Sequence, residues 1–216
     1  GAHKHKYRII DFHRSKRNIK GLVERIEYDP NRTSYIALIK YEDNEMRYII
    51  CPQKLEVGDT VESGKNVEIK VGNCLELIDI PQGSSIHNIE LVPNSGGKMA
   101  RSAGSSATLT GFDGNHAIIR LGSGETRKVS SKCMATLGSV SNPDQKNIKI
   151  GKAGRTRWKG QRPQSRGVVM NPVDHPHGGG EGKTSGGRNP VSPWGQSAKG
   201  LKTRRPQRSD KMIISR

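Results

Sequence analysis

Short apolar runs separated by polar breaks make up most of the first 150 residues of the chain. Residues 35–41 and 46–51 are rich in isoleucine and tyrosine, and the short polar link between them is suited to a β-hairpin. Residues 67–71 alternate apolar and charged side chains, which predicts a half-buried strand. Further runs lie at residues 59–62, 75–80 and 87–92. No amphipathic helical pattern is longer than about three turns, so the pattern predicts a small antiparallel β-barrel over residues 1–82.

A second group of apolar runs follows a glycine-rich crossing near residues 94–98. Asp-Gly and Gly-Ser-Gly sequences, at residues 112–115 and 122–124, separate these runs and are typical of tight turns between antiparallel strands. The runs themselves lie at residues 107–110, 117–121 and 125–129. We therefore expect a second compact barrel over residues 83–150 and an all-β fold class.

Charge is divided unevenly along the chain, and this division changes the picture of its last third. The whole chain carries 37 Lys+Arg against 20 Asp+Glu, a net charge of +17. Residues 151–216 hold fifteen of the basic and three of the acidic residues, a net +12, together with twelve glycines and six prolines. A segment of this composition cannot offset its chain entropy by apolar burial. It is predicted to be an irregular extension that becomes ordered on a polyanionic partner.

The same composition excludes several classes of protein. No apolar run approaches the roughly 20 residues that span a bilayer, and no N-terminal stretch resembles a signal peptide, so no membrane partner is expected. Cys51, Cys74 and Cys133 form no C-x-x-C pair, which argues against a disulfide framework and a cysteine-rich zinc site. They are expected to be small buried residues in a reducing compartment.

The extension opens with a cluster of basic residues around one tryptophan. Glycine lets the backbone approach a phosphate, arginine contacts a phosphate with two N–H groups, and Trp158 fits either a core anchor or a stacking surface for a base. The chain has no acidic segment that could neutralise the cluster, so we expect it to contact RNA. The basic residues of the cluster are Lys152, Arg155, Arg157, Lys159 and Arg162. Further RNA contacts are expected at Lys98, Arg101, Arg188, Lys199, Lys202, Arg204 and Arg205.

A segment rich in histidine and glycine follows at residues 166–182. His175 and His177 would share one face of an extended chain, with Asp174 and Glu181 nearby, and this combination invites the hypothesis of a metal-dependent hydrolase.

Two features of that segment argue against a metal site. Pro176 and the glycines at 178–180 place the histidines on a flexible loop without a rigid scaffold, and the sequence locates no third ligand. The alternative is a narrow loop between RNA strands, in which glycine permits close approach and histidine donates to phosphate or 2′-hydroxyl groups. We therefore expect no metal ligand and no catalytic residue.

The same segment carries a resemblance to a known family. Residues 167–182, Gly-Val-Val-Met-Asn-Pro-Val-Asp-His-Pro-His-Gly-Gly-Gly-Glu-Gly, resemble the signature of the universal large-subunit ribosomal protein two family, in its bacterial and organellar form. Segments at residues 26–32, 97–104, 151–154 and 190–195 resemble family segments in the same order. The resemblance covers residues 3–216.

That resemblance implies an oligonucleotide-binding-like barrel followed by an SH3-like barrel, with a basic rRNA-binding extension over residues 151–216. It implies a structural, non-enzymatic constituent of the large ribosomal subunit that binds rRNA, supports subunit assembly and association, and lies near the peptidyl-transferase centre. The implied partners are large-subunit rRNA, neighbouring ribosomal proteins and the small subunit, with no cofactor beyond Mg²⁺ held at RNA phosphates. The implied location is a ribosome in the bacterial cytoplasm, the mitochondrial matrix or the plastid stroma.

The resemblance also implicates His175 in peptidyl-transferase activity. Because RNA forms the reaction centre of ribosomes, we expect His175 to shape or hydrate RNA rather than to transfer a proton. RNA contacts within this segment are expected at Arg166, Asn171, Asp174, His175, His177, Gly178, Gly179 and Gly180.

A free single-strand-binding barrel protein is a third hypothesis. Such proteins line their binding face with aromatic side chains, on which bases stack. Two Trp, two Phe and five Tyr are too few for stacking to dominate, so contacts to the charged RNA backbone should carry most of the affinity.

Overall fold

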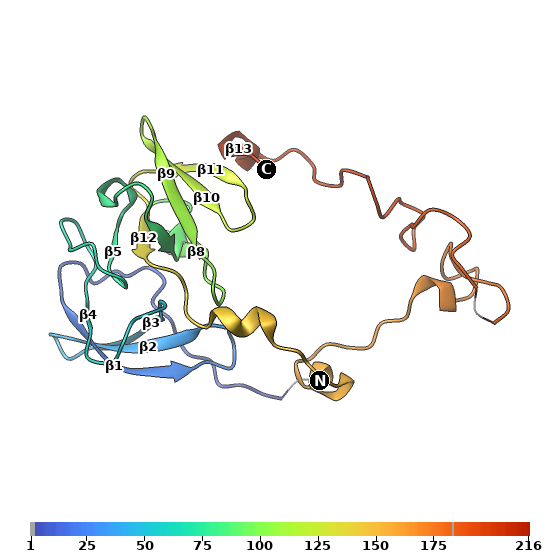
Figure 1. Cartoon of the computed structure of the whole chain (residues 1–216), viewed down its shortest axis with the longest axis horizontal. Coiled ribbons are helices and arrows are strands. Elements are labelled where there is room, and N and C mark those ends of the chain that lie inside the picture. Colours follow the sequence, from blue (N-terminus) through green and yellow to red (C-terminus); the bar gives the residue numbers. More distant parts are fainter. Residues whose placement is uncertain (1–2, 183) are drawn as a thin grey trace. The chain divides into compact units, whose positions relative to one another are not determined.

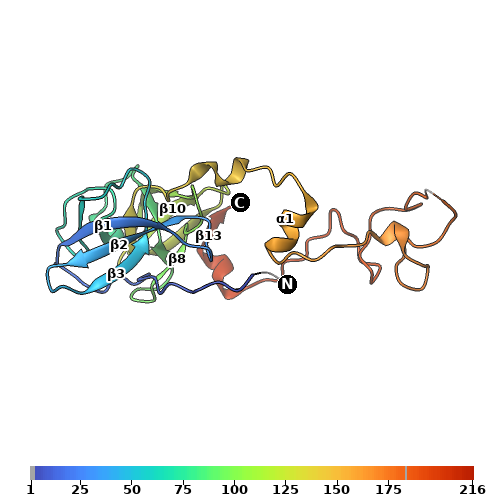
Figure 2. The ribbon, with the colours of Figure 1, turned by 90° about the horizontal axis from the view of Figure 1, so that it is seen from below.

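An antiparallel four-stranded sheet organises the first part of the chain in the computed structural model, which describes residues 3–182 and 184–216 (Figure 1). Its strands, in the spatial order β3-β2-β1-β4, are β1 (Gly21–Tyr28), β2 (Tyr35–Tyr41), β3 (Met46–Ile50) and β4 (Thr60–Val61). β2 and β3 form the hairpin that the sequence predicts, with Lys40 opposite Met46. Figure 2 shows β1, β2 and β3 side by side.

Strand β1 has a weak apolar pattern, because only Gly21 and Val23 of its eight residues are buried. A Cβ atom at Gly21 would lie 2.4 Å from Cγ2 of Ile39, so glycine is what lets β1 approach β2 at this point. Val23 and Ile39 belong to the same apolar core, together with Tyr41 and Ile49.

A seven-stranded sheet follows, in the spatial order β13-β11-β10-β9-β6-β12-β5. Its strands are β5 (Cys74–Glu76), β6 (Ser85–His87), β9 (Ala107–Asp113), β10 (His116–Leu121), β11 (Thr126–Ser130), β12 (Met134–Leu137) and β13 (Ile213–Ser215). The Asp-Gly and Gly-Ser-Gly sequences form the turns between β9, β10 and β11, as predicted. Leu75, Ile86, Leu109 and Ile119 pack in the core of this sheet. A two-stranded ladder joins β7 (Ile89–Glu90) to β8 (Gly97–Met99).

The helices are short. They are the 3₁₀ helices η1 (Leu77–Asp79), η2 (Pro143–Asn147), η3 (Gly167–Val169) and η4 (Arg208–Met212), and the α-helix α1 (Ala153–Trp158). Within the described ranges, no helix has the length and apolar character needed to cross a bilayer. The all-β fold class predicted from the sequence is confirmed.

The prediction of a half-buried strand at residues 67–71 is wrong. Asn66 and Gly72 adopt positive φ angles of 58° and 94°, which turn the chain at both ends of this run. Inside the run, the N–H of Lys70 donates to the carbonyl of Glu68 over 2.9 Å, which closes a tight turn. Ile69 is half exposed as a result. The alternating pattern here therefore reflects a loop that buries Val67 rather than a ladder of paired strands.

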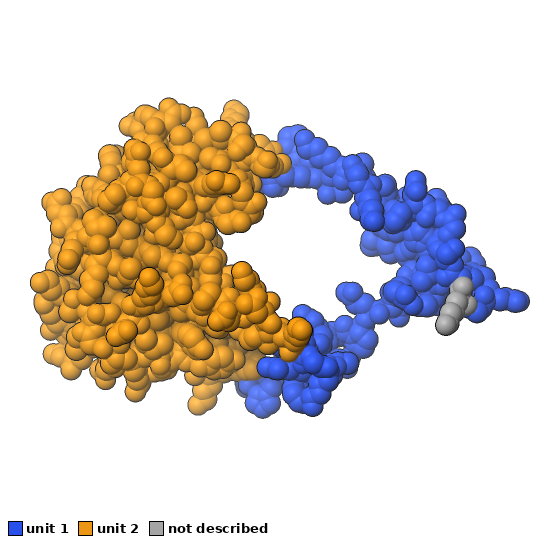
Figure 3. Space-filling view, viewed as in Figure 1, with its two compact units in different colours: residues 1–4, 150–207 blue, residues 5–149, 208–216 orange. Residues whose placement is uncertain are grey.

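The chain divides into two compact units, coloured separately in Figure 3. We call residues 5–149 with 208–216 the barrel unit, and residues 1–4 with 150–207 the loop unit. Within the barrel unit the two main sheets are joined by backbone bonds, including Gln53 N–H to the Ser139 carbonyl over 2.7 Å and Ser141 N–H to the Cys51 carbonyl over 3.0 Å. The C-terminal strand β13 pairs with β11, so the chain returns to the barrel unit after the loop unit.

Candidate nucleic-acid interface

Exposed basic side chains are the dominant feature of the loop unit. Helix α1 carries Arg155 and Arg157, which lie near its C-terminal end. The ammonium of Lys152 lies 4.8 Å from the ring centroid of Trp158, and that ring is 62 % exposed. Trp158 is therefore no core anchor, and base stacking at this residue stays a prediction. Among the described residues of the stretch 150–207, the exposed basic residues are Lys152, Arg155, Arg157, Lys159, Arg162, Arg166, Arg188, Lys199, Lys202, Arg204 and Arg205.

His175 is the one buried side chain among the described residues of the loop unit. Its Nδ1 atom accepts a hydrogen bond from the N–H of His177 over 3.0 Å. The two imidazole rings stack with centroids 5.1 Å apart and an angle of 23° between their planes. A Cβ atom at Gly167 would lie 2.4 Å from the His175 ring, so glycine in η3 leaves the space that the ring fills.

His177 is held by two backbone groups of the segment that follows it. Its Nδ1 lies 3.2 Å from the carbonyl of Gly186, and its Nε2 accepts the N–H of Val191 over 3.0 Å. Because a carbonyl only accepts, Nδ1 must carry the proton. These contacts fix the neutral ring in one tautomer and tie the histidine motif to residues 186–191.

The glycine run after the histidines packs against its own loop. A Cβ atom at Gly178 would lie 2.3 Å from the carbonyl oxygen of Asn171, and the N–H of Gly179 donates to the carbonyl of Met170 over 3.1 Å. The hydroxyl of Thr184 donates to the carbonyl of Gly179 over 3.2 Å. The sequence predicted a flexible loop without a scaffold. These contacts instead form a folded loop in which glycine is required by close packing within the protein.

Metal chemistry finds little support in this loop. Nδ1 of His175 and both ring nitrogens of His177 are engaged by protein groups, and Asp174 is exposed. Across residues 3–182 and 184–216, no group of three or more His, Cys, Asp or Glu side chains is arranged to hold a metal ion.

Residues 190–198 form a small hairpin at the end of this loop. Val191 pairs with Ser197, and the N–H of Ser192 donates to the carbonyl of Gln196 over 2.8 Å. The N–H of Gly195 closes the turn by donating to the carbonyl of Ser192 over 2.9 Å. Trp194 lies at the tip and is 89 % exposed, so its ring is not packed against the rest of the loop unit.

A second cationic site lies in the barrel unit, around Phe12. The guanidinium of Arg101 lies 4.6 Å from the Phe12 ring centroid, and that of Arg32 lies 5.6 Å from it. Arg32 also donates to the Asp29 carboxylate over 2.6 Å. Burial alone would raise the pKa of Asp29, but hydrogen bonds from Arg32 and Asn31 outweigh it and lower the pKa. A cavity of about 500 Å³ is lined here by Tyr7, Phe12, Asn31, Arg32, Thr33, Arg101 and Ser102.

Sequence reasoning identified Arg101 but missed Arg32 and Phe12. These residues are separated by 20 or more positions, and only the fold brings the two guanidinium groups to one ring. The signal that could have found Arg32 is the turn sequence Asp29-Pro-Asn-Arg32, which falls in a segment that resembles the family. Lys98, the other predicted residue of the barrel unit, is exposed on β8.

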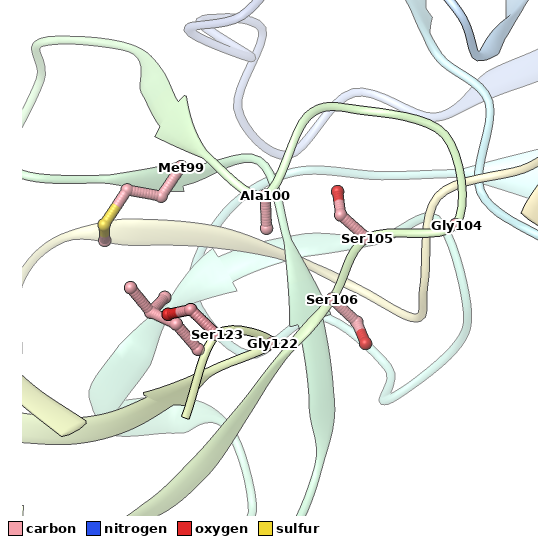
Figure 4. A pocket seen from close by; sticks show the side chains of 8 residues that line it. Met99, Ala100, Gly104, Ser105, Ser106, Gly122 and Ser123 are labelled. Atoms are coloured by element: carbon pink, nitrogen blue, oxygen red, sulfur yellow. The ribbon is translucent and has the colours of Figure 1, made fainter. Parts of the chain in front are cut away.

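A third surface feature lacks charge. A cavity of about 500 Å³ in the barrel unit, shown in Figure 4, is lined by Met99, Ala100, Gly104, Ser105, Ser106, Leu121, Gly122 and Ser123. Its described lining residues are apolar or hydroxylated, and no residue predicted as a site lines it. It therefore has no part in a cationic interface.

An all-β scaffold with many exposed guanidinium and ammonium groups defines a basic protein whose surface suits a polyanionic partner. Comparison with known proteins gives the family. Residues 1–63 match the family model of the Ribosomal Proteins L2, RNA binding N-terminal domain, and residues 70–195 match that of the Ribosomal Proteins L2, C-terminal domain.

Full-length relatives agree with the family models. The large ribosomal subunit protein uL2 of Pelagibacter ubique (strain HTCC1062) is 64 % identical over all 216 residues, which span 77 % of that relative. The protein of the same name from Rickettsia bellii (strain OSU 85-389) is 62 % identical over the whole chain, which spans 79 % of it. The chain therefore belongs to the ribosomal protein L2 family, which confirms the resemblance identified from its motifs.

Proposed function

We propose that the chain is a structural constituent of the large ribosomal subunit that binds large-subunit rRNA through the loop unit and supports the rRNA around the peptidyl-transferase centre. The observation that carries the proposal is the charge of residues 150–207: twelve basic and two acidic residues give a net +10. The described basic side chains are exposed, so their positive groups can reach phosphates. The proposal includes neighbouring ribosomal proteins and the small subunit as further partners.

The proposed role is positional and not enzymatic. Arginine gives two parallel N–H contacts to a phosphate, lysine gives a point charge, and neither discriminates between bases. The relatives compared come from bacteria, which supports a place in a bacterial or a bacterial-derived organellar ribosome.

The salt dependence of rRNA binding tests this proposal. Each phosphate contact steepens the log–log dependence of affinity on salt by about 0.7 to 0.9. Replacing four basic residues of the loop unit by glutamine should therefore flatten the slope by about 3. The four residues are Arg155, Arg157, Lys159 and Arg162.

A matched control removes the same charge from the barrel unit. Lys20, Lys54, Lys132 and Lys146 are exposed there, and their replacement by glutamine should change the slope far less. Equal slopes for the two quadruple variants would refute the loop unit as the main contact and leave only unspecific attraction between a basic protein and RNA.

The Phe12 site is proposed as a second rRNA contact. Arg101 is exposed, its guanidinium lies over the Phe12 ring, and its Nη1 donates to the Gly97 carbonyl over 3.2 Å, so these contacts order the guanidinium before binding. Arg101→Gln should weaken rRNA binding roughly tenfold, since hydrogen bonds to charged groups contribute about 1.5–3 kcal/mol. Arg101→Lys keeps the charge but loses the planar stacking group, so it should recover only part of the affinity. Full recovery would show that charge alone matters at this position.

His175 is proposed as a structural residue of the loop that lies against rRNA. Its burial, its ring stacking and its Nδ1 contact support a positioning role. In particles assembled with His175→Ala, peptide-bond rates should fall by a similar factor at every pH, because RNA placement is altered. A pH-dependent step in the rate that disappears in the variant, with RNA structure unchanged, would refute this.

A further inference from the structure

The most exposed tryptophan of the chain stands on a rigid support. Trp194 occupies the third position of the turn Ser192-Pro-Trp-Gly195, which is closed by the bond between Gly195 N–H and the Ser192 carbonyl. Pro193 restricts the backbone immediately before it, and Gly195 has a positive φ of 82° that other residues adopt at a cost. The hydroxyl of Ser192 also accepts the N–H of Gln196 over 3.2 Å. The turn therefore holds its backbone while an indole ring projects into solvent.

The base of this hairpin is fixed as well. The N–H of Ala198 donates to the carbonyl of Pro190 over 2.9 Å, and the N–H of Val191 donates to Nε2 of His177. Exposing a large aromatic ring to water is unfavourable, and this hairpin offers no protein surface that covers it. Exposed tryptophan side chains of this kind are typical of binding interfaces.

The charge around the hairpin indicates the chemistry of that partner. Residues 182–209 contain no aspartate or glutamate. Arg188, Lys199 and Lys202 flank the hairpin in sequence and are exposed. A protein surface would need a matching acidic patch, whereas a nucleotide offers both an anionic phosphate for these cations and a flat base for the indole.

We propose that Trp194 stacks on an unpaired base of the large-subunit rRNA, with the hairpin acting as the support that presents the ring. This inference rests on the proposed function and adds a base contact at Trp194 to the proposed phosphate contacts. Stacking is tolerant of base identity, because every base has a π face.

Fluorescence of a single-tryptophan protein tests the contact directly. In a Trp158→Phe background, Trp194 is the only tryptophan of the chain. Titration with transcribed large-subunit rRNA at fixed low salt should quench its emission at least twofold and saturate with the binding curve. Trp194→Ala should weaken binding about 5- to 150-fold, the range that corresponds to one stacked base.

Two further variants separate stacking from apolar bulk. Trp194→Phe keeps an aromatic face and should retain most of the affinity, whereas Trp194→Leu should behave like alanine. Chemical probing should show one or two unpaired bases that wild type protects and Trp194→Ala exposes, with the other protections intact.

The outcomes distinguish this inference from the function on which it rests. If rRNA binds with a steep salt slope while Trp194 emission and the Trp194→Ala affinity stay unchanged, the loop unit binds rRNA and the stacking inference falls. If Leu restores affinity as well as Phe does, the contact is apolar and not stacked, and the inference also falls. If the wild-type protein shows no salt-dependent rRNA binding, both the function and the inference fall.

Discussion

Val191 donates its backbone N–H to Nε2 of His177 over 3.0 Å, which joins the histidine motif to a hairpin that begins thirteen residues further along the chain. Nδ1 of the same ring contacts the Gly186 carbonyl, so one side chain is hydrogen-bonded to the backbone at two positions of the following segment. The histidine motif, which suggested a metal site in the sequence, therefore holds the hairpin that carries Trp194 in place through His177.

His177→Ala should loosen the hairpin at its base. Two hydrogen bonds are lost, and each contributes about 0.5–1.5 kcal/mol, so amide exchange at Val191 should accelerate roughly tenfold. His177→Gln places an acceptor near the Nε2 position and should restore slow exchange at Val191, whereas His177→Asn retains only a donor for the Gly186 carbonyl. If the amide of Val191 exchanged at the same rate in all three variants, His177 would not be holding the base of the hairpin.

Gly167→Ala should displace the His175 ring. The added Cβ would lie 2.4 Å from that ring, well inside normal contact, so either the ring or η3 must shift. The hydrogen bond from His177 N–H to Nδ1 should break, which ring ¹⁵N chemical shifts of His175 would report, and rRNA affinity should fall. Gly154→Ala in α1 is the matched control, because a Cβ there meets nothing within 4 Å. If the ring ¹⁵N chemical shifts of His175 in Gly167→Ala equalled those of the wild type, the loop would accommodate the added methyl group without displacing the ring.

Acid should weaken the barrel unit through His87. Burial lowers the pKa of this imidazole to about 4, and its Nδ1 lies 2.8 Å from the Gly138 carbonyl. In the unfolded chain histidine takes up a proton near pH 6.5, whereas the folded ring stays neutral until about pH 4. The stabilisation from a neutral His87 is therefore complete above pH 6.5 and is lost as the pH falls toward 4, by about 3 kcal/mol at most.

Urea unfolding at several pH values measures this effect. All five tyrosines lie between residues 7 and 48, so near-ultraviolet circular dichroism of tyrosine reports the barrel unit. The midpoint should fall between pH 6.5 and pH 4.5 in wild type. His87→Asn keeps an amide donor for Gly138 and removes the titrating ring, so its midpoint should change less in that range. Parallel profiles would assign the acid sensitivity to other groups.

Glu90 should be among the most sensitive positions in the barrel unit. Its carboxylate is buried and accepts the N–H groups of Gly96 over 2.8 Å and of Asn94 and Met134 over 3.1 Å each. Glu90→Ala leaves three donors unpaired and should cost about 3–5 kcal/mol of unfolding free energy, whereas Glu90→Gln should cost less because one acceptor oxygen remains. Glu24→Ala on exposed β1 should change stability by under about 0.5 kcal/mol in the same urea assay.

The sequence predicted the elements that depend only on residues close to one another in the chain. The β2–β3 hairpin has β-branched strands on either side of a polar turn, and the Asp-Gly turn between β9 and β10 requires only two residues. Strand β1 was missed because one of its faces is polar, and its fit depends on the space between Gly21 and Ile39. Residues 67–71 misled because the alternation of apolar and charged residues does not reveal turns at its ends.

The candidate interface divides in the same way. Charge and glycine content predicted which segment of the chain is cationic, since composition needs no fold. The pairing of Arg32 and Arg101 on Phe12 and the hydrogen bond between His177 and Val191 depend on contacts between distant residues. The exposure of Trp194 depends on the hairpin that carries it, which no apolar period reveals.

Strand β13 has a consequence for how the protein and its RNA come together. Its pairing with β11 anchors the C-terminal end of residues 150–207. The N-terminal end follows directly on η2 and the seven-stranded sheet of the barrel unit. A segment tethered at both ends explores fewer conformations than a free tail, so less entropy is lost when it becomes ordered. It also has no free tip to thread through a finished fold. In the proposed complex, RNA strands that surround this loop must close around it, which favours binding before the rRNA has completed its own tertiary structure.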